Sequence, residues 1–77
     1  MSERQLDARG LKCPLPVMMA AKVLRALPPG ALLRVLATDP LAPQDFRDLC
    51  ASQGHQLIET TEAAGASVCV IRSRASP

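Results

Sequence analysis

Proline and glycine residues divide this chain into short segments, which limits the folds it can adopt. The main interruptions fall at Pro14 to Pro16, Pro28 to Gly30, Asp39-Pro40, Gly54 and Gly65. No apolar stretch approaches the roughly 18 residues that a membrane span requires. With 77 residues, of which 48% are hydrophobic, the chain is expected to form one thin-cored domain over 1–77, with loose ends at 1–5 and 74–77.

Two segments have the periodicity of amphipathic helices. The first runs from Pro14 to Leu27, and the second runs from Leu41 to Gln53 with Gly54 placed to end it. Their apolar positions, at helical spacing, are Val17, Ala20, Ala21 and Leu24 in the first and Ala42, Phe46, Leu49 and Cys50 in the second.

The remaining segments read as strands. These are Leu6–Leu11, the nearly continuous apolar run Ala31–Ala37, and the pair Gln56–Thr61 and Ser67–Ser73, which residues 62–66 join as a hairpin. The order is then β-α-β-α-β-β. Because crossovers between parallel strands are right-handed, this order predicts a two-layer α/β sandwich, with two helices on one face of a mixed four-stranded sheet.

Composition argues against several function classes. A net charge of +2 and the lack of Trp and Tyr make direct nucleic-acid binding a weak expectation. Three widely spaced cysteines fit neither a disulfide framework nor a zinc site, so no metal is expected. With no leader and no membrane segment recognisable, we expect a cytoplasmic protein whose thiols remain reduced.

Cys13 stands directly before the first predicted helix, where Pro14 suits the first helical position. We therefore expect Cys13 to be the N-cap, where free backbone amides and the partial positive charge of the helix end favour a thiolate over a thiol. The thiolate-stabilising group is then Lys12, Pro14, Leu15, Pro16 and Val17. The alternative is that Cys13 is an ordinary small residue, but cysteine is a poor helix cap.

Four residues are candidates for partner docking: Met18, Lys22, Arg25 and Asp39. Met18 and its neighbour Met19 either pack in the core or give adaptable contacts beside the thiol. Lys22 and Arg25 form a basic strip that either is only solvated or steers an acidic partner. Asp39 is expected to cap the second helix and, if the first two strands are parallel, to lie on the same rim as Cys13.

The other thiols and the single histidine have simpler interpretations. Cys50 shares the apolar stripe of the second helix and reads as packing, although a resolving partner for Cys13 stays open. Cys69 lies within a predicted strand and reads as structural. His55 is a weak candidate for catalysis, because no Ser-His-Asp or paired-carboxylate arrangement accompanies it.

The stretch Leu6 to Met19, with its Cys13-Pro14-Leu15-Pro16 motif, resembles the opening of the TusA (SirA-like) sulfur carrier family, whose hallmark is C-P-x-P. The resemblance covers about residue 6 to residue 73. It implies that the residue matching Cys13 accepts sulfane sulfur as a persulfide and passes it on without a cofactor. Implied partners are a cysteine desulfurase or rhodanese-type donor and a downstream carrier of the DsrE/TusD-like kind.

The family resemblance leaves several matters open. It does not choose among tRNA thiolation, molybdenum-cofactor maturation and sulfur oxidation, nor does it decide between stoichiometric transfer and sulfurtransferase turnover. Leu15 stands where some members carry Glu, so the choice of partner is not transferred from those members. A thiol-based redox-sensing or regulatory module and a structural subunit are the competing hypotheses.

Overall fold

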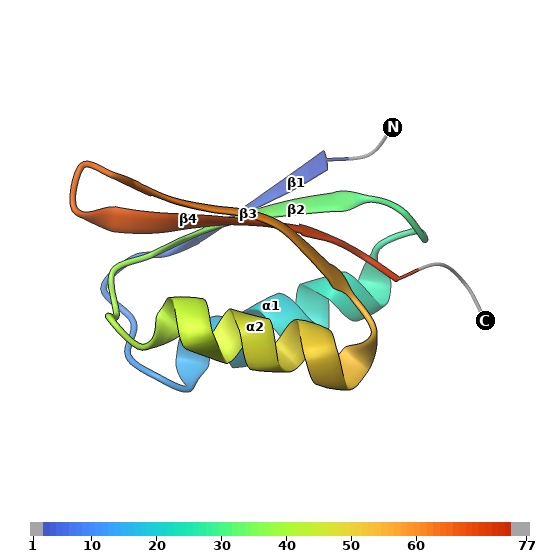
Figure 1. Cartoon of the computed structure of the whole chain (residues 1–77), viewed down its shortest axis with the longest axis horizontal. Helices are drawn as coiled ribbons and strands as arrows, with labels where there is room; N and C mark the ends of the chain where they lie inside the picture. Colours follow the sequence, from blue (N-terminus) through green and yellow to red (C-terminus); the bar gives the residue numbers. More distant parts are fainter. Residues whose placement is uncertain (1–2, 75–77) are drawn as a thin grey trace.

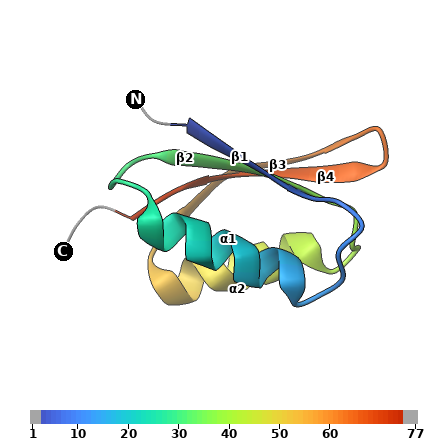
Figure 2. The same cartoon turned by 180° about the vertical axis from the view of Figure 1, so that it is seen from behind.

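The computed structural model describes residues 3–74, which form a four-stranded sheet covered on one face by two helices (Figure 1). In chain order the elements are β1 (Glu3–Ala8), α1 (Leu15–Ala26), β2 (Leu32–Ala37), α2 (Ala42–Gln53), β3 (Gln56–Ala63) and β4 (Ala66–Arg72). The view from behind shows both helices on the same side of the sheet (Figure 2). The predicted two-layer sandwich and its element order are confirmed.

The strand order places two similar loops next to each other. The order across the sheet is β1-β2-β4-β3; β1 and β2 are parallel, and β4 is antiparallel to both of its neighbours. Because β1 and β2 point the same way and each leads into a helix on the same face, α1 and α2 begin at the same end of the molecule (Figure 1).

The N-terminal boundary differs from the prediction. β1 spans Glu3–Ala8 rather than Leu6–Leu11, because its backbone pairs in register with β2 from Glu3 opposite Leu32 to Ala8 opposite Ala37. Residues Glu3 to Gln5 of this edge strand are polar and exposed, so a search for apolar patterns does not find the start of the strand. Gly10, with φ of 82°, then turns the chain toward α1. Residues 1–2 of the tail predicted to be loose lie outside the described residues.

The C-terminal strands form a tighter hairpin than predicted. Only Ala64 and Gly65 separate β3 from β4, with φ values of 52° and 80°, and a two-residue loop with both φ values positive matches a type I′ turn. Arg74, predicted to belong to the loose end, is instead held by its backbone N–H, which donates to His55 Nδ1 at 3.0 Å. Residues 75–77, the rest of the predicted loose end, lie outside the described residues.

The hydrophobic core lies between the sheet and the helices. Leu33 pairs with Ile71 and Val35 pairs with Cys69, and all four side chains are fully buried on the helix-facing side. Phe46 of α2 is the largest fully buried side chain of the core. By burying Phe46, the fold fixes the first turn of α2 close to the loop that joins β1 to α1.

Candidate functional site

Cys13 lies in the loop before α1, one residue further from the helix than predicted. The helix begins at Leu15 and its N-cap is Pro14, joined to Cys13 by a cis peptide bond. The backbone N–H of Leu15 donates to the carbonyl of Lys12 at 2.8 Å. The predicted N-cap role of Cys13 is therefore wrong, and the Leu15 amide is not free to stabilise a thiolate.

Asp39 fastens the loop that carries Cys13 to the loop that leads into α2. One carboxylate oxygen of Asp39 accepts the backbone N–H of Cys13, and the other accepts the N–H of Leu41 at 2.8 Å. Both bonds lower the pKa of Asp39, the one from Leu41 contributing most. A further bond, from Gly10 N–H to Thr38 Oγ1 at 2.9 Å, joins the same two loops.

The structure thus corrects one expectation for Asp39 and agrees with another. Asp39 is not the N-cap of α2, because the helix begins at Ala42 after Leu41, with a proline in its first turn. The chain between Asp39 and Ala42 folds as a turn, in which Ala42 N–H donates to the Asp39 carbonyl at 3.0 Å. Asp39 does lie beside Cys13, as the parallel arrangement of the first two strands predicted.

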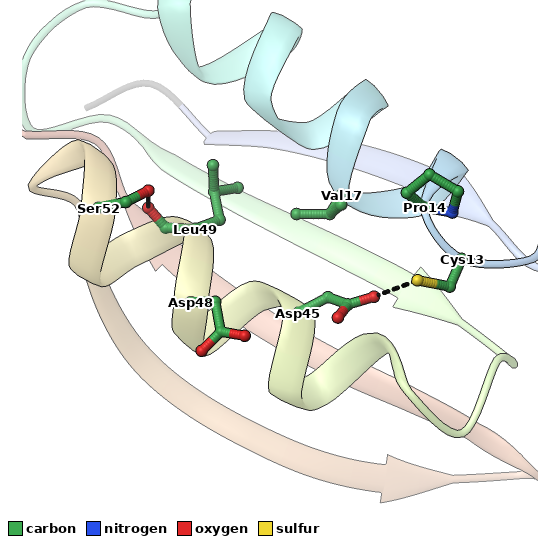
Figure 3. Close-up of a pocket in the computed structure, with 7 residues that line it drawn as sticks. All are labelled: Cys13, Pro14, Val17, Asp45, Asp48, Leu49 and Ser52. Atoms are coloured by element: carbon green, nitrogen blue, oxygen red, sulfur yellow. Dashed lines mark hydrogen bonds between the residues drawn. The ribbon is translucent and has the colours of Figure 1, made fainter.

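Asp45 is a site residue that the sequence reasoning missed. It lies in the first turn of α2, and the Cys13 thiol donates a hydrogen bond to its Oδ2 at 2.8 Å (Figure 3). The available signal was its position: once both helices start at one end of the molecule, an acidic residue in the first turn of the second helix lies close to the loop before the first.

The Asp45 contact reverses the expected ionisation of Cys13. The hydrogen bond to Asp45 raises the pKa of the Cys13 thiol above its ordinary value, and partial desolvation and the negative charges of Asp45 and Asp39 act in the same direction. The prediction of a favoured thiolate is therefore wrong for the protein by itself. The physical cause is that a thiolate would lose the hydrogen bond to Asp45 and face a like charge.

A shallow groove between the two helices opens beside the thiol. It has a volume of ≈ 350 Å³ and is lined by Cys13, Pro14, Val17, Asp45, Asp48, Leu49 and Ser52 (Figure 3). Its residues come from the start of α1 and from the facing side of α2. The floor is partly apolar, and two carboxylates, Asp45 and Asp48, supply negative charge.

The other motif and docking residues divide into buried and exposed groups. Pro16 is buried under the first turn of α1, and Val17 is half-buried. Leu15 and Met18 are 48% and 59% exposed. The exposed residues further include Lys12, Pro14, Lys22 and Arg25. Leu41, which the sequence reasoning did not select, is 59% exposed at the start of α2, so apolar side chains accompany both helix starts.

Cys50 and Cys69 are buried members of the hydrophobic core, which confirms their predicted packing role. Burial raises the pKa of both thiols. His55 follows the far end of α2, where it accepts the Arg74 amide, and desolvation followed by the Arg74 charge lowers its pKa. The structure therefore places His55 away from the start of α2, and away from Cys13.

Residues 3–74 offer neither a metal-binding cluster nor a membrane-spanning helix. This part of the chain contains no group of three or more His, Cys, Asp or Glu side chains arranged to hold a metal ion. Within the same residues, neither helix has the length and apolar character needed to cross a membrane.

Comparison with known proteins gives consistent matches over almost the whole chain. The family model described as sulfurtransferase TusA matches residues 4–73. A sulfur carrier protein TusA of Pseudomonas paraeruginosa is 49% identical over 70 residues, which cover 91% of this chain and 89% of that protein. A putative sulfur carrier protein of Neisseria meningitidis is 42% identical over 74 residues, covering 96% of this chain and 100% of that one.

Among solved structures, a SirA-like protein of Desulfitobacterium hafniense superimposes with a TM-score of 0.82. The two sequences are 27% identical, and the match covers 92% of this chain and 97% of that one. The same arrangement of helices and sheet is therefore present in a crystal structure.

Proposed function

This chain belongs to the TusA family of sulfur carrier proteins, and we propose that Cys13 is the residue on which it carries sulfur, as a persulfide. Exposure is the observation that supports this choice. All three cysteines of the chain lie within the described residues, and Cys13 is exposed whereas Cys50 and Cys69 are buried. A partner protein can therefore bring a sulfur atom to Cys13 without unfolding the carrier.

The proposed transfer balances without an external oxidant or reductant. Cys13 sulfur attacks the outer sulfur of a donor persulfide, so that a new S–S bond forms on Cys13 and the S–S bond of the donor breaks. The donor's inner sulfur leaves as a thiolate and takes up a proton equivalent to the one that Cys13 releases. A donor persulfide and a Cys13 thiol thus become a donor thiol and a Cys13 persulfide, and an acceptor cysteine repeats the exchange.

We place this exchange in a cytoplasmic relay. The donor is a cysteine desulfurase or a rhodanese-type protein, and the acceptor is a downstream carrier of the DsrE/TusD-like kind. The end use is tRNA thiolation, molybdenum-cofactor maturation or sulfur oxidation. Exposed Leu15, Met18 and Leu41 support this proposal, since they offer an apolar contact around the thiol. The chemistry requires no metal or organic cofactor, and each encounter transfers one sulfur atom stoichiometrically.

Intact-mass measurement tests the proposal. After incubation with a cysteine desulfurase and cysteine, we expect a mass increase of one sulfur atom that a reducing agent removes. We expect Cys13→Ser to lose the adduct, whereas Cys50→Ala and Cys69→Ala, as matched thiol controls, keep it. If wild-type protein gains no sulfur from the desulfurase or from any other sulfane donor, the proposed role of Cys13 is wrong.

The competing redox-sensor hypothesis predicts a different adduct. Redox-sensing cysteines depend on an accessible thiolate, whereas hydrogen bonding to Asp45 raises the pKa of Cys13 and disfavours that form. A docked donor brings its persulfide sulfur directly to Cys13, so we expect sulfur loading to proceed under conditions in which dilute hydrogen peroxide leaves most of the thiol unmodified. Rapid formation of an oxygen adduct without sulfur loading would favour the sensor.

A further inference from the structure

The contact between Cys13 and Asp45 joins two elements that are far apart in the chain. The residues are separated by 32 positions, yet Sγ and Oδ2 lie 2.8 Å apart across the groove (Figure 3). We propose that Asp45 controls the reactivity of Cys13: its carboxylate holds the empty carrier as a hydrogen-bonded thiol and repels the anionic outer sulfur of the loaded carrier. This inference rests on the proposed role of Cys13 as the sulfur-bearing residue.

Both partners in this contact are held in place by other interactions. Asp45 lies in the first turn of α2, where its backbone N–H donates to the Leu41 carbonyl at 3.1 Å, and the next residue, Phe46, is fully buried. Cys13 is held from the other side, because its backbone N–H donates to Asp39. The fold thus fixes the backbone positions from which the thiol and the carboxylate meet.

The charges around Cys13 are predominantly negative. Asp45 and Asp48 line the groove from α2, Asp39 approaches from the loop before α2, and Lys12 precedes Cys13 in its own loop. Of these carboxylates, Asp45 is the one to which the thiol itself donates. A thiol gains a charge-assisted hydrogen bond here, whereas a thiolate loses the bond and meets a like charge.

Loading Cys13 with sulfur replaces the hydrogen bond to Asp45 by charge repulsion. A persulfide is a stronger acid than the corresponding thiol, so at neutral pH it carries its negative charge on the outer sulfur, about 2.05 Å beyond Sγ. In that form Cys13 has no proton to donate to Asp45. The repulsion from the carboxylate then favours a side-chain rotamer that turns the outer sulfur away from α2, toward an approaching acceptor.

The two states of the carrier therefore differ in exposure of the reactive atom. An empty Cys13 is held as a thiol against α2 and reacts slowly with small electrophiles. A loaded Cys13 presents its sulfur outward. This difference would keep the empty carrier from being consumed by side reactions, because alkylation and oxidation proceed through the thiolate.

The pH dependence of alkylation tests the role of Asp45. We would measure iodoacetamide reaction rates between about pH 6 and pH 9 for wild type, Asp45→Asn, Asp45→Glu and Asp48→Asn. For Asp45→Asn we expect a profile shifted to lower pH and a rate at pH 7 roughly three- to tenfold above wild type. Asp45→Glu should restore slow alkylation, because it keeps the carboxylate.

Asp48→Asn is the matched control, since it removes the same charge from the same groove without removing the bond to Cys13. We expect its rate to stay within about twofold of wild type. Circular dichroism and urea unfolding establish that each variant is folded, and because Asp45 is not part of the hydrophobic core, the Asn variant should keep its structure. If the Asp45→Asn profile matches wild type or shifts to higher pH, the inference is wrong.

Sulfur loading separates this inference from the proposed function. In the loaded state we expect Asp45→Asn to keep its persulfide longer than wild type when a small acceptor thiol is added, because the repelling charge is gone. If wild type loads sulfur but alkylation and persulfide lifetime are unaffected by Asp45→Asn, Asp45 has no such role although Cys13 is the carrier residue. If wild type never loads, the role of Cys13 fails independently of the alkylation result.

Discussion

Removing the Phe46 ring should destabilise the whole domain, because this side chain is 0% exposed and is the largest fully buried one in the core. Truncating a buried Phe to Ala costs about 3–5 kcal/mol, through lost burial and the cavity that remains. For 77 residues the free energy of unfolding is roughly 4–12 kcal/mol. The Phe46→Ala variant is therefore expected to lose about a quarter or more of that free energy, or to unfold.

Urea unfolding followed by circular dichroism measures this loss. With a slope near 1 kcal/mol per molar for a small domain, Phe46→Ala should lower the urea midpoint by about 3 M or abolish the folded baseline. Phe46→Leu keeps most of the volume and should cost only about 1–2 kcal/mol. Leu41→Ala, at a position 59% exposed, should change the free energy of unfolding by less than about 0.5 kcal/mol.

A Phe46→Ala loss below about 1.5 kcal/mol would refute the reasoning, because it would mean that α2 is not anchored to the sheet through this ring. The result also bears on the site. Phe46 directly follows Asp45, so a loosened α2 would move the carboxylate relative to Cys13. In Phe46→Leu, provided that it folds, we expect iodoacetamide to react with Cys13 somewhat faster than in wild type.

Two further predictions concern the β3–β4 hairpin and the end of β1. Ala64 has φ of 52°, a conformation that costs a residue with a Cβ atom about 1 kcal/mol. In a urea unfolding assay, Ala64→Gly should therefore raise the free energy of unfolding by roughly 0.5–1 kcal/mol, whereas Gly65→Ala should lower it. The hydrogen bonds from Arg9 lower the pKa of Asp7 from 3.8 to about 2, so the stability this carboxylate contributes is present above pH 3.8 and lost as the pH falls toward 2. Wild type should exceed Asp7→Asn in urea midpoint by more at pH 6 than at pH 2, and an equal difference at both values would contradict this ionisation.

The layout of the fold was predictable because its elements depend on local patterns. Ala20 and Leu24, at helical spacing, are buried on the side of α1 that faces the sheet, and Gly54 ends α2 with φ of 80° as its position suggested. The limits of β1 were not predictable from hydrophobicity. An edge strand can begin at polar Glu3, since its position is set by backbone hydrogen bonds to β2 rather than by buried side chains.

The geometry of the site was predictable in part, whereas the ionisation of its thiol was not. The closeness of Cys13 and Asp39 followed from two parallel strands, which sequence order alone made plausible. The ionisation of the thiol did not follow, because it depends on Asp45, a residue of α2 that is 32 positions away in the chain and meets Cys13 only through the tertiary fold. The N-terminal end of a helix favours the thiolate of a cysteine placed before it, whereas a carboxylate at hydrogen-bond distance raises the thiol pKa.

The location of Cys13 in an open groove also bears on the order of events in the proposed relay. Donor and acceptor must both reach the same sulfur atom through a groove of ≈ 350 Å³ between α1 and α2, so the two large proteins compete for one surface. In the proposed relay, we therefore expect the loaded carrier to dissociate from its donor before an acceptor binds. We then expect ping-pong kinetics, in which an excess of empty acceptor slows loading by occupying the carrier.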